Sequence, residues 1–395
     1  MKHVVVIGCG FAGLTALNQL VKSKQVKLTL ISKESCFLFT PRLTELLNNS
    51  VKEKYAIKSV SEVFGNGIRN RIKFIKDKAI YINLEKNYVK TAKKAMGYDF
   101  LIMSQGAATN FFGNKTIEDN AIGYKDYKAV LKIKNTIKKS LQMAAKPELQ
   151  KIRKELLTFA VIGAGLTGIE LVCSLKEFVA EEIKNYPLIG EKAKFMLINS
   201  SKDIAEQLNV SVRRKIEKYL KKNGIEVILD TKAEDIKKNG INEINGMVKE
   251  IITSKGRIKA SAIIWTAGIK ANIIETYPKL PLEKNNAIKV TSKLKIPSYE
   301  NAYVGGDAAL FIENNKALPQ TAQVALHQGN HIGKNILRSI KGKKEKDFYY
   351  AYKGTLIVLG KKYGIFAHNK LVFGGKIAWH FRNIFYLYRF WKMTR

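Results

Sequence analysis

The sequence predicts an α/β protein with two doubly wound folds, the second inserted in the first, followed by a separate C-terminal segment. The folds are predicted because an apolar run, a glycine-rich turn and a helical pattern open the chain, and the same order returns about 155 residues later. The C-terminal segment is predicted because the composition changes after Asp347. Strands that alternate with helices in this way form parallel sheets with helices on both faces.

The first unit begins almost at the N-terminus. Residues 4–7 (VVVI) form a short apolar run, which is typical of a strand buried on both faces. The turn GCGFAG follows at 8–13, and a helical pattern then runs from 14 to about 21. A second apolar run at 26–31 completes a strand–helix–strand unit.

The second unit repeats this order. An apolar run at 159–162 (FAVI) leads into GAGLTG at 163–168, and a helix is expected to about residue 179. The first fold is expected to resume near residue 300, at NAYVGGDAA. The other expected elements are a Lys-rich helical stretch at about 125–155 and strands at 100–103, 194–198 and 262–266.

The glycine turns point to bound dinucleotides. In such a turn the first glycine permits a sharp bend, the second lets the backbone approach a pyrophosphate, and the third lets helix and strand pack closely. The helix N-terminus then faces the anion. Two such turns in one chain are more specific than one, and they indicate two Rossmann-like dinucleotide-binding folds with the glycines Gly8, Gly10, Gly13, Gly163, Gly165 and Gly168.

An acidic residue usually ends the second strand of such a fold and binds the adenosine ribose. Ser32 stands there in the first unit, with Glu34 two residues on, and Asn199 stands there in the second. Both residues can hydrogen-bond a ribose, although Asn199 also suits an ordinary turn. Because neither strand ends in a carboxylate that would repel a 2′-phosphate, the nicotinamide cofactor can be either NADH or NADPH. Asp307 follows a short strand and two glycines, which suits a contact to a ribityl or phosphate-ribose group.

Charge and cysteine content narrow the class of protein. The formal net charge is +36, which favours anionic partners such as lipid headgroups. No nucleic-acid-binding signature accompanies it, so specific nucleic-acid binding is not expected. The three cysteines form no CxxC pair and fit a reducing compartment. The N-terminus does not read as a signal peptide, no run is long and apolar enough to span a bilayer, and no metal site is expected.

The C-terminal segment is basic and aromatic. Residues 348–395 contain nine Lys or Arg, no Asp or Glu, and fourteen aromatic residues. From about 376 to 391, apolar residues fall at helical spacing, with Arg382, Arg389 and Lys392 between them. Such a helix can lie in a bilayer interface with its basic groups near lipid phosphates. A dimer contact, or a final helix packed on the core, is the alternative.

With these motifs in place, the sequence resembles the type II NADH dehydrogenases, single-chain NADH:quinone oxidoreductases of the two-dinucleotide-binding-domain flavoprotein superfamily. The similarity runs from residue 2 to about 375, and TAQVA at 321–325 is its most family-specific part. The segments that carry it are 31–43, 100–110, 163–171, 265–272, 305–309 and 318–329.

The resemblance implies roles for individual residues. FAD would be held by Gly8, Gly10, Gly13, Ser32, Lys33, Pro41, Gly106 and Asp307. The nicotinamide cofactor would be held by Gly163, Gly165, Gly168, Glu170, Asn199 and Gly268, with Glu170 near the nicotinamide end. Ala322, Gln323 and the next helical turn would lie between flavin and quinone.

One position departs from the family pattern. The family usually has a second Gln where this chain has His327, followed by Gln328. A histidine can hydrogen-bond a quinone carbonyl and can supply a proton near neutral pH. His327 is therefore a candidate catalytic residue together with Glu170 and Gln323, although it also suits an ordinary helix histidine.

The resemblance implies a peripheral enzyme at the cytoplasmic face of the cell membrane. It would transfer hydride from NADH to FAD and then two electrons to a quinone, without pumping protons, and a homodimer is expected. The alternatives are a sulfide:quinone oxidoreductase-like enzyme or an NADPH-dependent flavoprotein reductase. The expected domains are an FAD-binding domain (1–120 and 275–340), an NAD(P)H-binding domain (155–274) and a membrane-anchoring or dimerisation segment (341–395).

Overall fold

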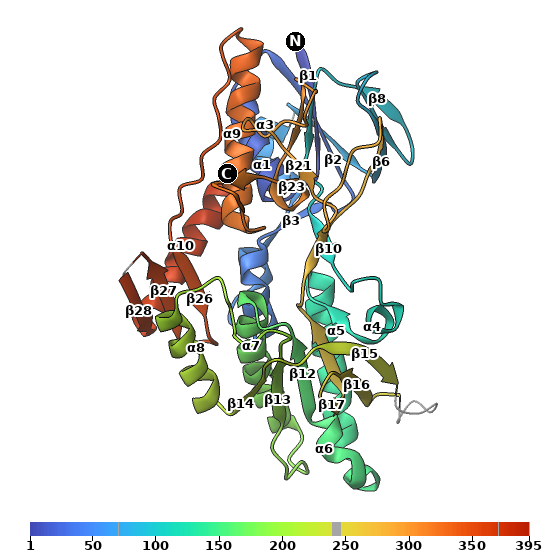
Figure 1. The fold of residues 1–395 in the computed structure, drawn as a ribbon, viewed down its shortest axis with the longest axis vertical. Helices are drawn as coiled ribbons and strands as arrows, with labels where there is room; N and C mark the ends of the chain where they lie inside the picture. The colour runs from blue at the N-terminus through green and yellow to red at the C-terminus, as the bar shows by residue number, and fades with distance from the viewer. Residues whose placement is uncertain (70, 239–245, 370, 395) are drawn as a thin grey trace.

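The structure is a computed structural model that describes residues 1–69, 71–238, 246–369 and 371–394. The ribbon has an upper and a lower lobe, and the N-terminus lies at the top of the upper one (Figure 1). The C-terminal elements run along one side, where the two lobes meet.

The upper lobe is built on a five-stranded parallel sheet with the order β22-β9-β1-β2-β5. The strands are β1 (Lys2–Ile7), β2 (Val26–Ser32), β5 (Ile72–Lys76), β9 (Phe100–Met103) and β22 (Ala302–Val304). The predicted apolar runs are therefore confirmed as strands. Because β22 pairs in the same sheet as β1, the first fold is discontinuous, as predicted.

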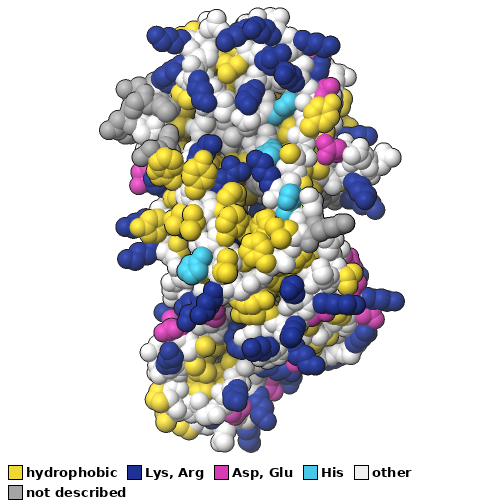
Figure 2. All heavy atoms as spheres, turned by 90° about the vertical axis from the view of Figure 1, so that its left-hand side faces the viewer, with side chains coloured by type: hydrophobic (Ala, Val, Ile, Leu, Met, Phe, Trp, Pro, Cys, Tyr) yellow, Lys and Arg dark blue, Asp and Glu magenta, His cyan; other side chains and the backbone are white. Residues whose placement is uncertain are grey.

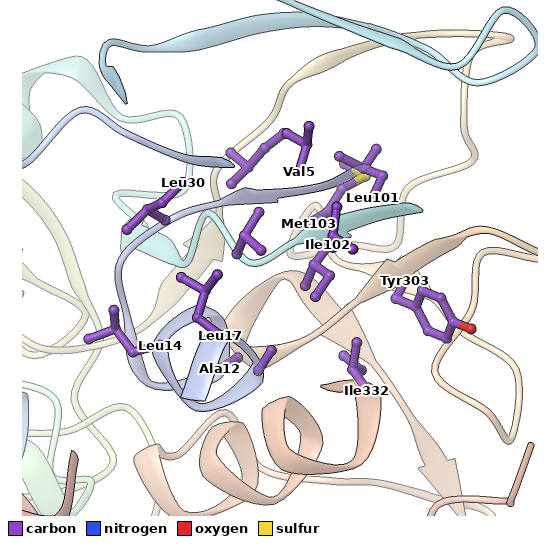
Figure 3. Close-up of a cluster of buried hydrophobic side chains, with 14 of the residues drawn as sticks. Val5, Ala12, Leu14, Leu17, Leu30, Leu101, Ile102, Met103, Tyr303 and Ile332 are labelled. Atoms are coloured by element: carbon purple, nitrogen blue, oxygen red, sulfur yellow. The ribbon is translucent and has the colours of Figure 1, made fainter. Parts of the chain in front are cut away.

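Two helices, α1 (Phe11–Leu20) and α9 (Ala322–Ile340), pack against each other on one face of this sheet. They come so close that a Cβ at Gly329 would fall on the Ala12 carbonyl oxygen. A Cβ at Gly333 would lie 2.8 Å from the Ala16 carbonyl oxygen. Figure 3 shows Ile332 of α9 directed toward the strand residues of the same buried cluster. Because these two residues lack a Cβ, α9 can pack directly on the backbone of α1, the helix that follows the first glycine turn.

The lower lobe repeats the arrangement, with the order β11-β18-β12-β13-β14 and all four pairings parallel. Its strands are β11 (Ile122–Gly123), β12 (Thr158–Ile162), β13 (Lys194–Ile198), β14 (Ile225–Ile228) and β18 (Ala262–Trp265). Its principal helices are α5 (Tyr127–Ala144), α7 (Leu166–Glu182) and α8 (Val210–Lys222). The predicted second Rossmann-like fold is confirmed.

The lobes are joined by a two-stranded antiparallel ribbon, β10 (Ala107–Thr109) with β19 (Ile269–Ala271). The chain thus leaves the upper lobe through β10 and returns through β19, which makes the lower fold an insertion. The strand β11 and the helix α5 already belong to the lower layer, before residue 155. The domain boundaries given above stay a prediction.

Smaller elements complete the two lobes. In the upper lobe and its flanks they are β3 (Cys36–Leu38), α2 (Leu43–Leu47), β4 (Ile57–Ser59), α3 (Val60–Arg69), β6 (Ala79–Asn83), β7 (Tyr88–Thr91), β8 (Ala95–Gly97), β20 (Glu275–Tyr277), β21 (Ile288–Lys289), β23 (Ala309–Leu310), β24 (Ile312–Glu313) and β25 (Lys316–Ala317). In the lower lobe they are α4 (Lys115–Asn120), α6 (Arg153–Leu156), β15 (Ala233–Lys238), β16 (Lys249–Thr253) and β17 (Gly256–Ala260).

The C-terminal segment forms three antiparallel strands and a helix: β26 (Thr355–Val358), β27 (Gly364–His368), β28 (Leu371–Gly375) and α10 (Lys376–Met393). The predicted helix over 376–391 is confirmed. The expectation that Arg382 faces lipid is wrong, because its side chain is 1% exposed. Its guanidinium donates to the Pro41 carbonyl oxygen (2.8 Å) and lies 2.6 Å from the Glu45 carboxylate, which ties α10 to α2.

The other face of α10 is apolar and exposed. Five large side chains from the predicted apolar pattern at 376–391 are exposed: Ile377, Phe381, Ile384, Tyr388 and Trp391. Figure 2 shows hydrophobic side chains gathered on the side that carries the C-terminal elements, with Lys and Arg around them. Within the described residues, no helix is long and apolar enough to cross a membrane.

Candidate functional site

A cleft of about 810 Å³ opens at the carboxyl ends of the upper strands. This is the edge where doubly wound sheets bind their ligands. Residues of the link between the lobes, including Gly106 and Asn272, form another part of its wall. Seven of the predicted site residues line the cleft: Gly8, Gly10, Ser32, Lys33, Gly106, Asp307 and Ala322.

The three glycines of the turn after β1 have different surroundings. Gly8 has φ +100°, and a Cβ there would fall on the Ser104 carbonyl oxygen. A Cβ at Gly13 would fall on the carbonyl oxygen of Gly8 itself. Gly10 differs, because no protein atom lies within 4 Å of the place a Cβ would take. The outer glycines serve backbone packing, while the middle one keeps space open for a ligand in the cleft.

The turn after β12 has the same construction. Gly163 has φ +105°, and a Cβ there would lie 2.8 Å from Ala267 backbone atoms. A Cβ at Gly168 would fall on the Gly163 carbonyl oxygen, and nothing lies within 4 Å of one at Gly165. Gly268, predicted for the same site, follows directly after Ala267. The structure therefore brings the four predicted glycines of this site together.

The ends of the second strands are arranged differently in the two folds. The Ser32 hydroxyl donates to Cys9 Sγ (3.1 Å) and accepts from the Glu34 N–H (3.2 Å). The side chain of Glu34 is exposed, and this residue lines the cleft beside Lys33. Ser32 thus shapes the turn, and the Glu34 carboxylate stands two residues later at the cleft.

In the second fold, Asn199 fixes the glycine turn. Its Oδ1 accepts from the Ala164 N–H (3.0 Å), and its Nδ2 donates to the Asp203 carbonyl oxygen (3.0 Å). Both ends of the amide are therefore engaged within the protein, which is the turn role considered for this residue. Its contact to a ribose stays a prediction.

Two cleft residues were not singled out from the sequence. Lys125, in the loop between β11 and α5, lies 2.8 Å from the Asp307 carboxylate. The Gln320 side-chain amide donates to the Asp307 carbonyl oxygen (2.6 Å). Lys125 comes from the lower layer and Asp307 from the upper sheet, so this ion pair crosses the cleft. A lysine within a Lys-rich stretch gave no signal that would single it out.

The helix α9 points its N-terminus at the cleft. The Thr321 hydroxyl caps it by accepting from the Val324 N–H (3.3 Å). Gln323 and His327 lie one turn apart on one side of the helix. Gln328 is buried on another side, where its Oε1 accepts from the Gly306 N–H (2.8 Å). Gln328 therefore serves the upper fold and cannot stand in for the glutamine that His327 replaces.

His327 is half-buried, and its ring lies edge-on to Tyr350 at 5.4 Å. Burial lowers the pKa of His327, and the positive charges of Lys353 and Arg389 lower it further. The neutral imidazole is thus favoured at pH 7. It can donate or accept a hydrogen bond without carrying a charge.

Glu170 and Pro41 each form a hydrogen bond with the C-terminal segment. Glu170 accepts from the Val358 N–H of β26 (2.8 Å). Burial raises the pKa of Glu170 to about 7, against the opposing effects of Arg382 and of that hydrogen bond. Pro41 is bonded through its carbonyl oxygen to Arg382 and does not line the cleft. The predicted cofactor roles of these two residues stay predictions.

No group of three or more His, Cys, Asp or Glu side chains that could hold a metal ion occurs in the part of the chain that the structure describes. Two open glycine turns, at corresponding edges of two parallel sheets, define a two-dinucleotide-binding oxidoreductase. The chain belongs to the pyridine nucleotide-disulphide oxidoreductase family, whose sequence model matches residues 2–329.

Individual relatives are more specific. The type II NADH:quinone oxidoreductase Ndh of Mycobacterium tuberculosis is 26% identical over 392 residues, which cover 95% of this chain and 82% of the relative. NDH2 of Plasmodium falciparum, solved in complex with NADH, has a TM-score of 0.84 at 18% identity and covers 100% and 96% of the two chains. The sulfide:quinone oxidoreductase of Aquifex aeolicus has a TM-score of 0.79 at 20% identity, covering 100% and 92%. The resemblance inferred from the sequence is confirmed.

The open glycines allow the two cofactor sites to be tested separately. A Cβ at Gly10 or Gly165 meets no protein atom, and both residues have extended backbone angles that alanine adopts. We expect Gly10→Ala to melt within about 2 °C of wild type when both are freed of FAD, and to lose most FAD binding. Gly165→Ala is expected to keep FAD but to weaken NADH binding by at least about tenfold.

Thermal melts, the flavin-to-protein absorbance ratio and NADH titrations check these outcomes. Gly13→Ala is the matched control, since its Cβ collides with backbone and should impair folding itself. Normal FAD content in a folded Gly10→Ala variant would contradict the assignment of this turn.

The raised pKa of Glu170 predicts a pH-dependent stability. Its folded pKa of about 7 lies above the ordinary value of 4.5, so the folded chain keeps this proton after the unfolded chain has lost it. Stability should therefore fall as pH rises from about 4.5 to about 7. Glu170→Gln removes this loss, and we expect it to gain on the order of 2 kcal/mol relative to wild type between pH 5 and pH 8.

Urea unfolding at several pH values measures the difference. The exposed variant Glu118→Gln is the control for loss of one acidic residue. A constant difference between Glu170→Gln and wild type across this pH range would refute the raised pKa of Glu170.

Proposed function

We propose that this chain is an NADH:quinone oxidoreductase of the type II NADH dehydrogenase kind. The observation that carries the proposal is the pair of open glycine turns at the cleft edges of two parallel sheets, in one chain whose curated relatives bear this activity over nearly its whole length. When bound, FAD supplies the two-electron chemistry that connects a hydride donor to a quinone.

The upper cleft fits FAD. Its volume suits a large cofactor, and the open Gly10 leaves room for a pyrophosphate. The N-terminus of α1 directs its free N–H groups toward that position. In this proposal Lys125 orients Asp307, and the two share the polar contacts that the bound cofactor needs. The residues proposed to hold FAD are Gly8, Gly10, Gly13, Ser32, Lys33, Pro41, Gly106, Asp307 and Ala322.

The lower fold fits the nicotinamide cofactor. The N-terminus of α7 faces the open Gly165, which gives the same anion site as in the upper fold. The fold places no carboxylate at Asn199, so the choice between NADH and NADPH depends on its surroundings. The residues proposed for this site are Gly163, Gly165, Gly168, Glu170, Asn199 and Gly268.

The quinone is proposed to approach the N-terminal part of α9. Gln323 and His327 lie on one side of this helix, and the aromatic ring of Tyr350 packs against His327. A neutral His327 can hydrogen-bond a quinone carbonyl, and it can take up a proton from solvent before passing it on to the reduced quinone. Glu170, with a pKa of about 7, is a second group that can hold a proton near physiological pH.

Sulfide oxidation is the second candidate, because a sulfide:quinone oxidoreductase has a similar fold. That chemistry needs a reactive pair of cysteines at the flavin. No cysteine follows Cys173 in the sequence, and burial strongly raises the pKa of the Cys173 thiol. Cys9 lies inside the phosphate turn and hydrogen-bonds there. Cys36 lines the cleft near Cys9, but burial raises the pKa of both thiols, so neither is a ready thiolate and the NADH-dependent reaction is favoured.

Anaerobic titration of the purified protein tests the proposal. We expect NADH to bleach the oxidised-flavin absorbance, and a soluble quinone to restore it, because each nucleotide has its own binding turn. NADPH is titrated separately to determine the donor. If neither nicotinamide bleaches the flavin but sulfide does, the sulfide reaction replaces the proposed one.

We further propose that the chain binds the membrane peripherally at its cytoplasmic face. The exposed apolar side of α10 would enter the interface, with Arg389 and Lys392 near anionic headgroups. Arg389 of α10 lies near enough to His327 of α9 to lower its pKa, so binding through α10 would bring the proposed quinone site toward the lipid phase where quinone dissolves. The expected homodimer stays a prediction.

The membrane proposal predicts the effect of charge on this face. Two side chains, Ile377 and Ile384, are 77% and 68% exposed. Converting both to Glu should reduce co-sedimentation with anionic vesicles by at least about tenfold, because carboxylates enter the interface poorly and are repelled by its charge. Leu188→Glu, at an equally exposed residue of the lower lobe, should bind vesicles like wild type. Equal binding by all three proteins would refute this role of α10.

A further inference from the structure

One bulky residue holds an unusual backbone conformation beside the lower fold. Phe112 lies between β10 and α4 in the sequence, and Figure 1 shows β10 at the junction of the two lobes. It has φ +54°, a region that bulky side chains rarely adopt, and it is 66% exposed. Backbone strain raises the free energy of the folded protein, and so does exposing a large aromatic ring to water. Backbone strain of this kind is concentrated at ligand-binding sites.

The surrounding contacts impose this conformation. Asn110 accepts the Phe112 N–H through its Oδ1 (2.9 Å) and donates its own N–H to the Gly268 carbonyl oxygen (3.0 Å). The Trp265 indole N–H donates to the Asn110 carbonyl oxygen (2.9 Å). The neighbouring Phe111 turns inward and lies 6.1 Å from the Trp265 ring. Phe111 therefore packs half-buried against the core, while Phe112 touches the Trp265 ring only edge-on, at 6.5 Å, and keeps most of its surface exposed.

The ring stands at the ligand edge of the lower sheet. The strands β12 and β18 are neighbours. The chain leaves β12 toward β13 on one side, and it enters β18, on the other side, after crossing over from β14. Doubly wound sheets bind nucleotides outside the carboxyl ends of such a strand pair. The Phe112 ring lies 3.2 Å from the place a Gly268 Cβ would take, directly after β18. Gly163, after β12, abuts the adjacent Ala267.

We propose that Phe112 is an aromatic cover for the nicotinamide half of the cofactor in the lower fold, an inference that rests on the proposed function. The adenosine half belongs on the β13 side, where Asn199 ends the strand. Phe112 stands on the opposite side, next to β18 and the link to the upper lobe. A cofactor ring packed on Phe112 buries its exposed face and offsets the backbone strain. Phe112 is thus a positioning residue that helps bring the nicotinamide toward the flavin cleft.

The test compares two ligands on the FAD-loaded protein by calorimetry. NAD⁺ carries the nicotinamide half, and ADP lacks it. Phe112→Asn removes the ring, and asparagine tolerates positive φ, so its melting temperature should equal or exceed that of wild type. We expect NAD⁺ to bind about 3- to 10-fold more weakly, which corresponds to one aromatic contact, while ADP binding changes by less than about twofold.

Two further variants sharpen the comparison. Phe112→Tyr keeps the ring and should bind NAD⁺ within about twofold of wild type. Leu188→Ala removes an exposed apolar side chain elsewhere in the lower lobe and should change neither affinity.

The outcomes separate this inference from the proposed function. Unchanged NAD⁺ binding by Phe112→Asn, with normal binding by wild type, would overturn the role of Phe112 alone. Equal weakening of NAD⁺ and ADP, or a lowered melting temperature, would overturn it as well, because either result indicates a structural role. Failure of wild type to bind NAD⁺ would overturn the proposed function together with this role.

Discussion

The close contact of backbone with backbone in the two glycine turns is the constraint on which the cofactor sites depend. In each turn the third glycine lies against the carbonyl of the first, and a hydroxyl after a neighbouring strand secures the end of the first strand. Ser104 donates to the Ile7 carbonyl oxygen, and Thr266 donates to the Ile162 carbonyl oxygen, both at 2.8 Å. These contacts fix where each helix begins, so its N-terminal N–H groups face an anion site.

The position of α9 follows from the same constraint. Gly329 and Gly333 let α9 approach α1 until backbone contacts backbone, and α1 is itself fixed by the first glycine turn. The start of α9 is thereby set at the cleft, which carries Gln323 and His327 to their places. A Cβ at either glycine would lie within 2.8 Å of a backbone oxygen of α1, so the two helices would have to move apart. Packing far from the cleft therefore determines the geometry of the proposed quinone site.

The strands and the glycine turns could be predicted because each depends on a short stretch of sequence. The buried strands appear as apolar runs because both of their faces are covered, and the turns appear as glycines because a Cβ has no room. Contacts between residues that are far apart in the chain leave no recognisable pattern in the sequence. Lys125 meets Asp307 across 182 positions, and Glu170 meets Val358 across 188, so neither partner could be named from the sequence. Similarly, only the structure shows that Gln328 serves the upper fold.

Arg382 shows why composition alone misplaces a charge. It belongs to a basic helix, yet it is buried with Arg42 around Glu45, and its guanidinium packs over the Tyr386 ring at 4.1 Å. Burying two guanidinium groups costs desolvation energy that one carboxylate only partly offsets, so this cluster is weak evidence for stability. Its directional bonds to Pro41 and Glu45 instead select one orientation of α10. Because Arg382 must face inward, the opposite side of the helix, with Ile377 and Ile384, must face outward. The buried guanidinium of Arg382 thus determines which apolar face of α10 is exposed on the protein surface.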